Sequence, residues 1–380
     1  MSKTKIGILG GGQLGKMLFQ AASRLDMDIH FMDKSALGPV GKLAQNFTLG
    51  NITTFEDVIK FGTDKDVMTI EIEKVNTAAL VELHKHGVQI YPQPEVLEII
   101  QDKGTQKEFY KEKELPTSEY RLVESKEELL LLVDQGEIAI PFVQKLRKDG
   151  YDGKGVHLVR DEKTLEEVFD APCVIEDLVD IEKEIAVITC TSIDGRSVVY
   201  DPVEMVFHPT ANLLLYQLAP AVVTKKIAKK AKELALLTSE AYGVVGLLAI
   251  EMFLTKKGDL LINEVAPRPH NSGHHTIEAA VCSQYENHLR AISGLPLGDT
   301  SLTNKSLLIN VLGSPDHSGK AIYNGLESVM AKRHAHLHIY GKLQTSPYRK
   351  MGHINLVDKD YKTLIADYED IMRTFQVISS

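Results

Sequence analysis

Short blocks of apolar residues alternate with polar, glycine-containing turns along the first hundred positions. Residues 5–9 predict a strand, and residues 13–25 predict a helix with one apolar face made by Leu14, Met17, Leu18, Ala21 and Leu25. Further strands are predicted at 29–32, 67–72 and 88–90, with a helix at 77–86. Short strands that alternate with helices are typical of a parallel, doubly wound α/β sheet.

The pattern changes near residue 100, where a charged helix is predicted at 101–114. A second helix at 125–135 begins with the capping-box spacing of Ser125 and Glu128. Beyond it the pattern predicts strands at 138–145 and 156–159, a helix at 225–242, a hairpin at 246–264, strands near 307–311 and 334–340, and a last helix near 361–375. This mixture indicates α+β structure after the first α/β domain.

Composition narrows the class of protein. The chain has 380 residues, of which 43% are hydrophobic and 25% charged, so two or three globular domains are expected. A net charge of −9 argues against a nucleic-acid or membrane surface. Three scattered cysteines make no disulfide framework, and no apolar run reaches the length of a membrane span or a signal peptide. We therefore expect a cytoplasmic protein.

Glycines 10, 11, 12 and 15 follow the first predicted strand and open the first predicted helix. Glycines let a phosphate approach the backbone, and a helix N-terminus offers N–H donors to it. Asp33, at the end of the next strand, leaves a dinucleotide site open as an alternative, and a plain tight turn is another.

A second loop, at 145–155, holds four cations and three glycines between two predicted strands. Such a basic hairpin loop suits the covering of a nucleotide triphosphate. An ordinary solvated turn is the alternative. The loop lacks the P-loop pattern, because no helix follows it.

Two glutamates in the predicted hairpin point to a metal. A turn centred between residues 257 and 258 would place Glu251 opposite Glu264, with Asn263 beside them. Opposed carboxylates repel each other, and a magnesium ion that bridges to phosphates would remove the conflict. A solvated acidic pair is the alternative.

A polar loop follows the hairpin at 266–276. It places Arg268, His270, Asn271, Ser272 and His274 within seven positions. Prolines on both sides of Arg268 restrict its backbone, and a second histidine follows His274. So many donors next to a metal–carboxylate site suit an oxyanion or a phosphorylated intermediate. The spacing of the histidines matches no standard zinc site.

Five motifs in order resemble one enzyme family: 10–18 (GGGQLGKML), 101–109 (QDKGTQKEF), 150–155 (GYDGKG), 261–275 (LINEVAPRPHNSGHH) and 283–298 (SQYENHLRAISGLPLG). Together they resemble the N5-carboxyaminoimidazole ribonucleotide synthetases of purine biosynthesis, in the ATP-grasp superfamily. The resemblance implies an N-terminal α/β domain at 1–102, an ATP-grasp domain at 103–296 with a lid near 115–180, and a C-terminal domain at 297–380. It also implies a homodimer whose product passes to a mutase.

The reaction that this resemblance implies joins bicarbonate to 5-aminoimidazole ribonucleotide through carboxyphosphate, with ATP and Mg²⁺ (or Mn²⁺). Catalytic roles are implied for Arg268, Lys145, Asp152 and His270. ATP contacts are implied for Lys103, Lys145, Gly150, Tyr151, Asp152, Gly153, Lys154, Gly155, Val156, Glu176, Asp177, Leu178, Glu184, His208, Asn263 and Glu264. Substrate contacts are implied for Gly12, Gln13, Leu14, Glu73, Tyr151, Asp152, Arg268, His270, Asn271, Ser272, Lys342 and Arg349, and metal ligation for Glu251 and Glu264.

The chain departs from the family pattern in three places. Lys103 stands where the family often has an arginine, Asp149 stands where many members have a glycine, and residues 189–191 occupy a strand end where many members carry an arginine. Three other functions stay open. A formate-dependent ribonucleotide transformylase would share the magnesium pair, an NAD-dependent dehydrogenase would use only the first glycine loop, and a nucleotide-binding regulator would lack turnover.

Overall fold

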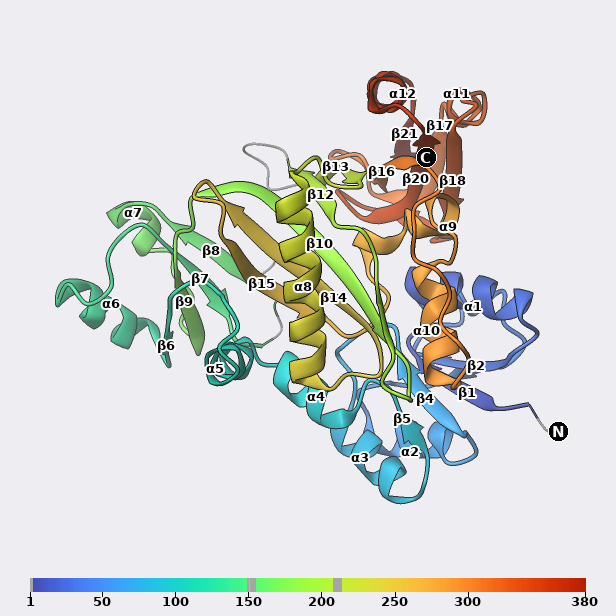
Figure 1. The fold of residues 1–380 in the computed structure, drawn as a ribbon, viewed down its shortest axis with the longest axis horizontal. Coiled ribbons are helices and arrows are strands. Elements are labelled where there is room, and N and C mark those ends of the chain that lie inside the picture. Colours follow the sequence, from blue (N-terminus) through green and yellow to red (C-terminus); the bar gives the residue numbers. More distant parts are fainter. Residues whose placement is uncertain (1–2, 149, 151–154, 208–213) are drawn as a thin grey trace. The chain divides into compact units, whose positions relative to one another are not determined.

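The computed structural model describes residues 3–148, 150, 155–207 and 214–380 (Figure 1). The chain forms two compact units and passes between them several times. Unit 1 contains residues 1–94, 185–249 and 266–380, and unit 2 contains residues 95–184 and 250–265.

Unit 1 begins with a five-stranded parallel sheet in the order β3-β2-β1-β4-β5. Its elements are β1 (Lys5–Leu9), α1 (Gln13–Arg24), β2 (Asp28–Asp33), β3 (Phe47–Leu49), α2 (Phe55–Gly62), β4 (Val67–Ile70), α3 (Thr77–Lys85) and β5 (Gln89–Ile90). The doubly wound sheet that the sequence predicts is confirmed. The strand order reverses between β1 and β4, and ligands of such sheets bind at the carboxyl ends of strands at this point.

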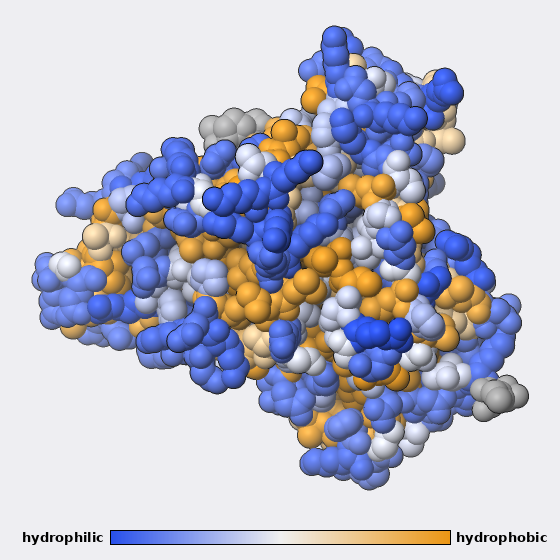
Figure 2. All heavy atoms as spheres, in the orientation of Figure 1, coloured by the Kyte–Doolittle hydropathy of each residue, from blue (hydrophilic) through white to orange (hydrophobic). Residues whose placement is uncertain are grey.

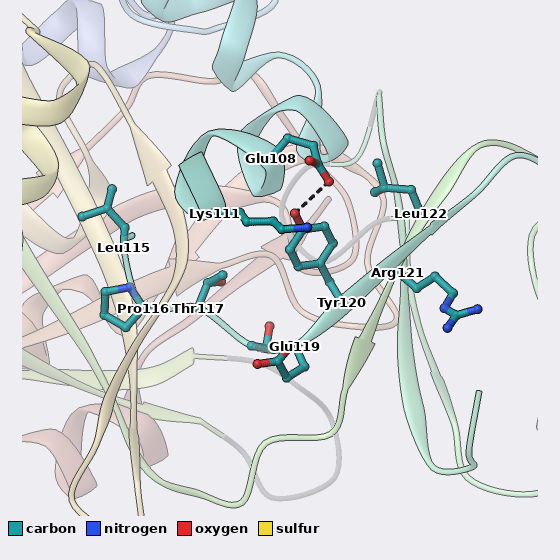
Figure 3. A pocket seen from close by; sticks show the side chains of 10 residues that line it. Glu108, Lys111, Leu115, Pro116, Thr117, Glu119, Tyr120, Arg121 and Leu122 are labelled. Carbon is teal, nitrogen blue, oxygen red and sulfur yellow. Dashed lines mark hydrogen bonds between the residues drawn. The ribbon is translucent and has the colours of Figure 1, made fainter. Parts of the chain in front are cut away.

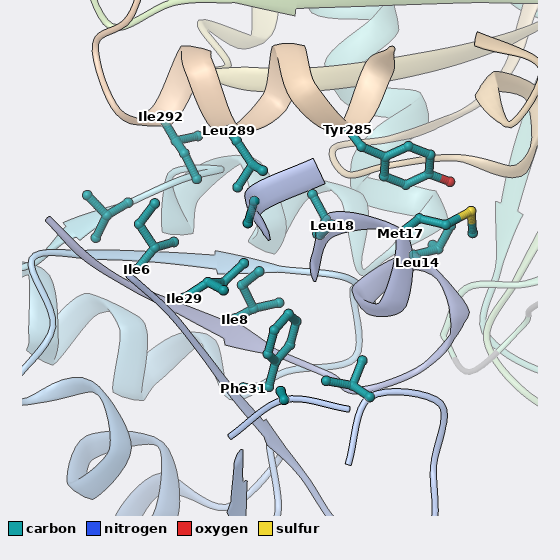
Figure 4. Packing of buried hydrophobic residues seen from close by; sticks show 14 of the residues in the cluster. Ile6, Ile8, Leu14, Met17, Leu18, Ile29, Phe31, Tyr285, Leu289 and Ile292 are labelled. Carbon is teal, nitrogen blue, oxygen red and sulfur yellow. The ribbon is translucent and has the colours of Figure 1, made fainter. Parts of the chain in front are cut away.

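The helix α10 (Gln284–Ile292) belongs to the core of this sheet, although more than 200 residues separate it from β4. Figure 4 shows Tyr285, Leu289 and Ile292 of α10 directed toward the apolar face of α1 and the sheet. The three side chains are buried in one cluster with Ile6, Ile8, Leu14, Met17, Leu18, Ile29 and Phe31. The apolar face of α1 is therefore covered by a helix that the local sequence does not indicate.

The rest of unit 1 is mainly antiparallel. A nine-stranded sheet has the order β15-β14-β10-β12-β13-β16-β20-β18, with β11 beside β10, and its strands β10, β14 and β15 each run from one unit into the other. A second, three-stranded sheet has the order β19-β17-β21. The elements are β10 (Ile181–Thr191), β11 (Ser197–Val199), β12 (Val203–Phe207), β13 (Leu214–Ala219), α8 (Lys225–Tyr242), β14 (Gly246–Thr255), β15 (Leu260–Ala266), η1 (Asn271–Gly273), α9 (Thr276–Ala279), β16 (Lys305–Leu312), β17 (Gly319–Asn324), α11 (Leu326–Met330), β18 (Ala335–Ile339), β19 (Gln344–Thr345), β20 (Lys350–Asp358), α12 (Tyr361–Thr374) and β21 (Gln376–Ser379).

Helix α8 begins and ends where the sequence predicts. The Thr224 side chain accepts a hydrogen bond from the Ile227 N–H at its start, and Gly243 ends it in the left-handed conformation. Lysines lie in the first half of α8, where Figure 2 shows hydrophilic residues. The lysine row is thus a solvated helix face.

Unit 2 is built on a four-stranded antiparallel sheet in the order β6-β9-β7-β8. Its elements are α4 (Pro94–Ile100), α5 (Lys103–Glu112), β6 (Tyr120–Val123), α6 (Lys126–Asp134), β7 (Phe142–Leu146), β8 (Val156–Val159), α7 (Glu162–Leu165) and β9 (Cys173–Asp177), together with parts of β10, β14 and β15. One of the two hydrogen bonds of the predicted capping box forms at the start of α6: Ser125 Oγ accepts from the Glu128 N–H. The Glu128 carboxylate accepts from the Glu124 N–H instead of the Ser125 N–H.

Two boundaries in unit 2 correct the sequence analysis. The strand predicted at 138–145 begins only at Phe142, because Pro141 directly before it has no N–H to offer to a neighbouring strand. The turn of the β14–β15 hairpin spans residues 256–258, with the Thr255 N–H donating to the Asp259 carbonyl at 2.9 Å and Gly258 at φ +84°. At the turn Thr255 is therefore bonded to Asp259, whereas the predicted turn would set Thr255 opposite Leu260. The predicted turn is thus one residue out of register, and the pairing of Glu251 with Glu264 stays a prediction.

Candidate active site

The predicted site residues fall on both units. The glycine loop, the loop at 266–276 and the C-terminal cations lie in unit 1, and the lysines and carboxylates assigned to ATP and magnesium lie in unit 2. Each half has its own internal contacts.

In unit 1 two carboxylates hold the glycine loop. Glu71, just after β4, accepts hydrogen bonds from the N–H groups of Gly12 (2.8 Å) and Gly15 (2.7 Å). Asp33, at the end of β2, accepts from the Gly11 N–H at 2.7 Å. Burial raises the pKa of the Glu71 carboxyl, and the two backbone donors partly offset this effect. The loop is therefore already ordered by the protein's own acidic groups.

This arrangement changes which backbone groups remain for a phosphate. The Gly12 N–H, one of the predicted substrate contacts, is bonded to Glu71. Gln13 and Leu14 lie in the first turn of α1, where the helix offers no acceptor for their N–H groups. Both oxygens of Asp33 bond to backbone N–H groups, of Gly11 and Ser35, which argues against its use for a ribose.

Arg268 and Glu73 form an ion pair in unit 1. Arg268 Nη2 lies 2.8 Å from Glu73 Oε1, and both side chains are three-quarters or more buried. Arg268 Nη1 also donates to the Pro269 carbonyl at 2.9 Å, which fixes the plane of the guanidinium. The structure thus brings together two residues that the sequence placed at one site.

The loop after β15 is held through backbone and side-chain contacts. Gln284 bonds to both the N–H (2.9 Å) and the carbonyl (2.7 Å) of His270. His270 Nδ1 lies 2.8 Å from Ser272 Oγ, and Asn271 Nδ2 donates to Asn310 Oδ1 at 3.2 Å. These anchors give the loop a defined conformation.

The two predicted C-terminal cations contact backbone carbonyls of their own region. Lys342 Nζ donates to the Lys350 carbonyl at 2.7 Å, and Arg349 Nη1 donates to the Gln344 carbonyl at 2.8 Å. Their place at the phosphate stays a prediction.

In unit 2 the predicted phosphate-binding lysines meet the C-terminal half of β15, away from the turn of the hairpin. Asp102 caps α5 by accepting from the N–H groups of Gly104 and Thr105, and this places Lys103 in the first turn. Lys103 Nζ lies 3.2 Å from Glu264 Oε2. Lys145, on β7, donates to Asn263 Oδ1 at 2.8 Å and to Glu176 Oε2 at 3.0 Å. Two lysines thus meet two neighbouring oxygen-bearing residues of β15.

A third lysine belongs to this group, and the sequence analysis did not name it. Lys107 Nζ lies 3.1 Å from Glu176 Oε1 and donates to Thr117 Oγ1 (2.6 Å) and Ser118 Oγ (2.9 Å). Its position four residues after Lys103, on the same face of one helix, is the signal that was available. The Glu176 side chain is occupied by these lysines, so a contact to adenine at Glu176 would use backbone groups.

The other predicted nucleotide contacts differ in exposure. Asp177 and Leu178 are exposed at the end of β9. Glu184 lies mostly buried on β10, and burial raises the pKa of its carboxyl to about 7, with Lys145 acting in the opposite sense. Of the second glycine loop, Gly150, Gly155 and Val156 are described, and Gly155 has φ +80°.

Tyr151, Asp152, Gly153, Lys154 and His208, and the departure at Asp149, lie outside the described residues. Their predicted roles therefore stay predictions. Among the described residues, no group of three or more His, Cys, Asp or Glu side chains gathers as for a metal ion. The oxygen donors of Glu251, Asn263 and Glu264 suit magnesium, which usually takes one or two carboxylates and completes its shell with phosphate and water.

A hollow of about 480 Å³ lies in unit 2 beside the segment from Leu115 to Leu122 (Figure 3). Within it Tyr120 OH donates to Glu108 Oε1 at 2.8 Å. None of the predicted site residues lines this hollow.

Comparison with known proteins agrees with this organisation. Residues 3–101 match the ribonucleotide synthetase preATP-grasp domain, residues 108–285 the ATP-grasp domain, and residues 306–367 the phosphoribosylaminoimidazole carboxylase C-terminal domain. The N5-carboxyaminoimidazole ribonucleotide synthase of Bacillus subtilis is 36% identical over 93% of this chain and 91% of its own length. This chain belongs to the N5-carboxyaminoimidazole ribonucleotide synthase family. The family assigns it to the ATP-grasp ligases.

Solved structures agree with this assignment. The synthetase of Thermotoga maritima has a TM-score of 0.91 and 40% identity, covering 99% of this chain and 100% of that one. An Aspergillus clavatus synthase, in complex with ADP and 5-aminoimidazole ribonucleotide, has a TM-score of 0.87 and 30% identity over 98% of both chains. The fold class expected from the sequence is confirmed.

Some relatives are longer proteins. The phosphoribosylaminoimidazole carboxylase of Candida albicans is 38% identical over 94% of this chain, which spans 64% of that protein's length. The described residues include no helix with the length and apolar character of a membrane span.

Proposed function

We propose that this protein carboxylates 5-aminoimidazole ribonucleotide with bicarbonate, at the expense of ATP, to give N5-carboxyaminoimidazole ribonucleotide, ADP and phosphate. The observation that carries the proposal is the group of lysines that meets oxygen donors on β15: Lys103 with Glu264, and Lys145 with Asn263. Such a group suits a triphosphate and its metal. The family membership and the ligands of the Aspergillus clavatus structure support the choice of substrates.

ATP is a substrate, and Lys103 and Lys145 would bind its phosphates. Glu251 and Glu264 would hold Mg²⁺, which neutralises phosphate charge when bound. Glu264 then neutralises Lys103, and Asn263 accepts a hydrogen bond from Lys145, until each lysine exchanges this oxygen partner for a phosphate of ATP. Glu184 would accept hydrogen bonds from the ribose hydroxyls, and residues 176–178 would contact the adenine.

The chemistry proceeds in two balanced steps. A bicarbonate oxygen attacks the γ-phosphorus and ADP leaves, which gives carboxyphosphate. The exocyclic amine then forms a bond to the carboxyl carbon, directly or after release of CO₂, and phosphate leaves while the amine loses a proton. Arg268, held by Glu73, would steady the anion, with Lys145, Asp152 and His270 as the other predicted catalytic residues.

The remaining assignments are part of the same proposal. The ribonucleotide phosphate would bind at the first turn of α1, with Gly12, Asn271, Ser272, Lys342 and Arg349 among its predicted contacts. The domain boundaries at 102 and 296, the homodimer, the use of the product by a mutase and the cytoplasmic location stay predictions. Three free cysteines fit a reducing compartment.

ADP release tests the proposal. ATP, magnesium and bicarbonate are supplied with and without 5-aminoimidazole ribonucleotide, to the wild type and to Glu264→Gln. We expect the ribonucleotide to stimulate ADP release and the variant to abolish it. Glu233→Gln is the matched control, because it removes the carboxylate of another Lys–Glu pair, with Lys229, on the exposed face of α8. A wild type that binds ATP but shows no stimulation contradicts the substrate assignment.

A further inference from the structure

Lys107 is a buried cation that the proposed chemistry does not use. Its side chain is 3% exposed, against 12% for Lys145 and 23% for Lys103. It is fixed by Thr117 Oγ1, Ser118 Oγ and Glu176 Oε1 at 2.6, 2.9 and 3.1 Å. A lysine held on three sides by the protein is not available to bind a phosphate directly.

Glu176 lies between two ammonium groups. One carboxylate oxygen faces Lys107, and the other accepts from Lys145 (3.0 Å) and from Ser118 Oγ (2.9 Å). Burial raises the pKa of Glu176, but Lys145 and Lys107 outweigh burial, and the pKa lies below its ordinary value. Burial also lowers the pKa of Lys107 to about 8, so that it is mostly protonated at pH 7.

The charges of this group therefore do not cancel. Two ammonium groups share the carboxylate of Glu176, and the hydrogen-bonding partners Ser118, Thr117 and Asn263 are neutral. The carboxyl of Glu184 also interacts with Lys145, but burial raises its pKa to about 7, so that it carries only part of a negative charge at pH 7. Without Lys107, Glu176 would neutralise Lys145, and the pair would have little attraction for an anion. With Lys107 present, a net positive charge is left over, and it lies on Lys145, the more exposed of the two lysines.

We propose that Lys107 is a positioning residue that engages Glu176 and so leaves the charge of Lys145 available to the phosphates of ATP. The inference rests on the proposed role of Lys145 at the nucleotide. Lys107 acts through Glu176 and makes no contact with substrate.

The test is a double-mutant cycle read by ATP binding in titration calorimetry. Lys107→Met keeps the length of the side chain and removes its charge. It should weaken ATP binding roughly ten- to hundred-fold, the worth of one charge-assisted contact. Adding Glu176→Gln removes the carboxylate that then neutralises Lys145. The double variant should therefore bind ATP at least about five-fold more tightly than Lys107→Met alone.

A purely structural role predicts the opposite order. Removing two members of a buried network would then weaken binding further, and a double variant that binds no better than Lys107→Met overturns the inference. Lys107→Arg, which retains the charge, should stay within a few-fold of the wild type in KM for ATP, and an Arg variant as weak as Met also contradicts it. Thermal melting without ligand establishes that each variant is folded, and Lys107→Gln replaces Lys107→Met if the latter does not fold.

Lys65→Met is the matched control. Lys65 is also a buried lysine, 8% exposed and paired with Asp64, but it lies in unit 1 over the Phe61 ring. Its loss should leave ATP affinity unchanged, even if it lowers stability. Because the readout is nucleotide binding, a wild type that binds ATP but ignores the ribonucleotide would refute the proposed substrate and leave this inference intact.

Discussion

Glu184 gives the sharpest pH prediction. Burial raises the pKa of its carboxyl from 4.5 to about 7, so that the folded protein holds a proton that the unfolded chain releases above pH 4.5. Between these two values the folded state binds more protons, and stability falls as the pH rises. The contribution of Glu184 is fully present below pH 4.5 and is lost as the pH rises through 7. Glu184→Gln mimics the protonated form and does not titrate.

The size of the effect follows from the shift. One pKa unit corresponds to about 1.4 kcal/mol, and between pH 5 and pH 8 the wild type should lose about 2–3 kcal/mol relative to Glu184→Gln. Thermal midpoints of both proteins, measured at pH 5 and pH 8 without nucleotide, report the difference. The midpoint of the variant should gain a few degrees over the wild type on going from pH 5 to pH 8.

Glu182→Gln is the control for this experiment, because Glu182 lies two residues earlier on the same strand and is exposed. It should show less than half of the pH-dependent gain. Equal gains for the two variants, or a Glu184→Gln gain that does not change between pH 5 and pH 8, would refute the reasoning from burial.

Three other variants test separate parts of the account. Arg268→Lys should lower kcat at least ten-fold with little change in KM for ATP, because one ammonium cannot both pair with Glu73 at 2.8 Å and hold an anion bidentately; an unchanged kcat contradicts this. Gly12→Ala places a Cβ 2.6 Å from Glu71 Oε1 and so disturbs the glycine loop. It should raise KM for the ribonucleotide several-fold and leave KM for ATP unchanged. Equal changes in both KM values would argue against a ribonucleotide phosphate at this loop. Burial lowers the pKa of His288 to about 4, so the wild type should lose about 2 kcal/mol of stability as the pH drops from 7 to 5. In thermal melts His288→Gln should lose less stability than the wild type over this range, and an equal loss would contradict the prediction.

The sequence predicts those helices and strands whose cap residues or apolar pattern lie within the element or directly beside it. Helix α8 is bounded by a threonine cap at 224 and a glycine at 243, and both signals are in the sequence itself. The parallel sheet follows from strands β1 and β2 and the helix between them, whose apolar pattern covers five or more residues each. The glycine loop was recognisable because its position between strand and helix requires no knowledge of distant residues.

What was missed depends on contacts distant in sequence. The turn of the β14–β15 hairpin has Thr255 bonded to Asp259 and Gly258 at φ +84°, and the sequence could not select it because turns of different length fit the same residues. Glu71 is 56 residues from Gly15, and Lys107 is 69 residues from Glu176, so their contacts appear only once the chain is folded. The packing of α10 on α1 was missed for the same reason, because the two helices are distant in sequence and meet only in the folded chain.

Transfer of labelled carbon tests the central claim most directly. The protein is supplied with ¹³C-bicarbonate, ATP, magnesium and 5-aminoimidazole ribonucleotide, and the ribonucleotide product is followed by NMR together with ADP. The account predicts one labelled carboxyl group on the exocyclic nitrogen for each ADP formed, and no label without ATP. ADP release without label in the ribonucleotide would contradict it.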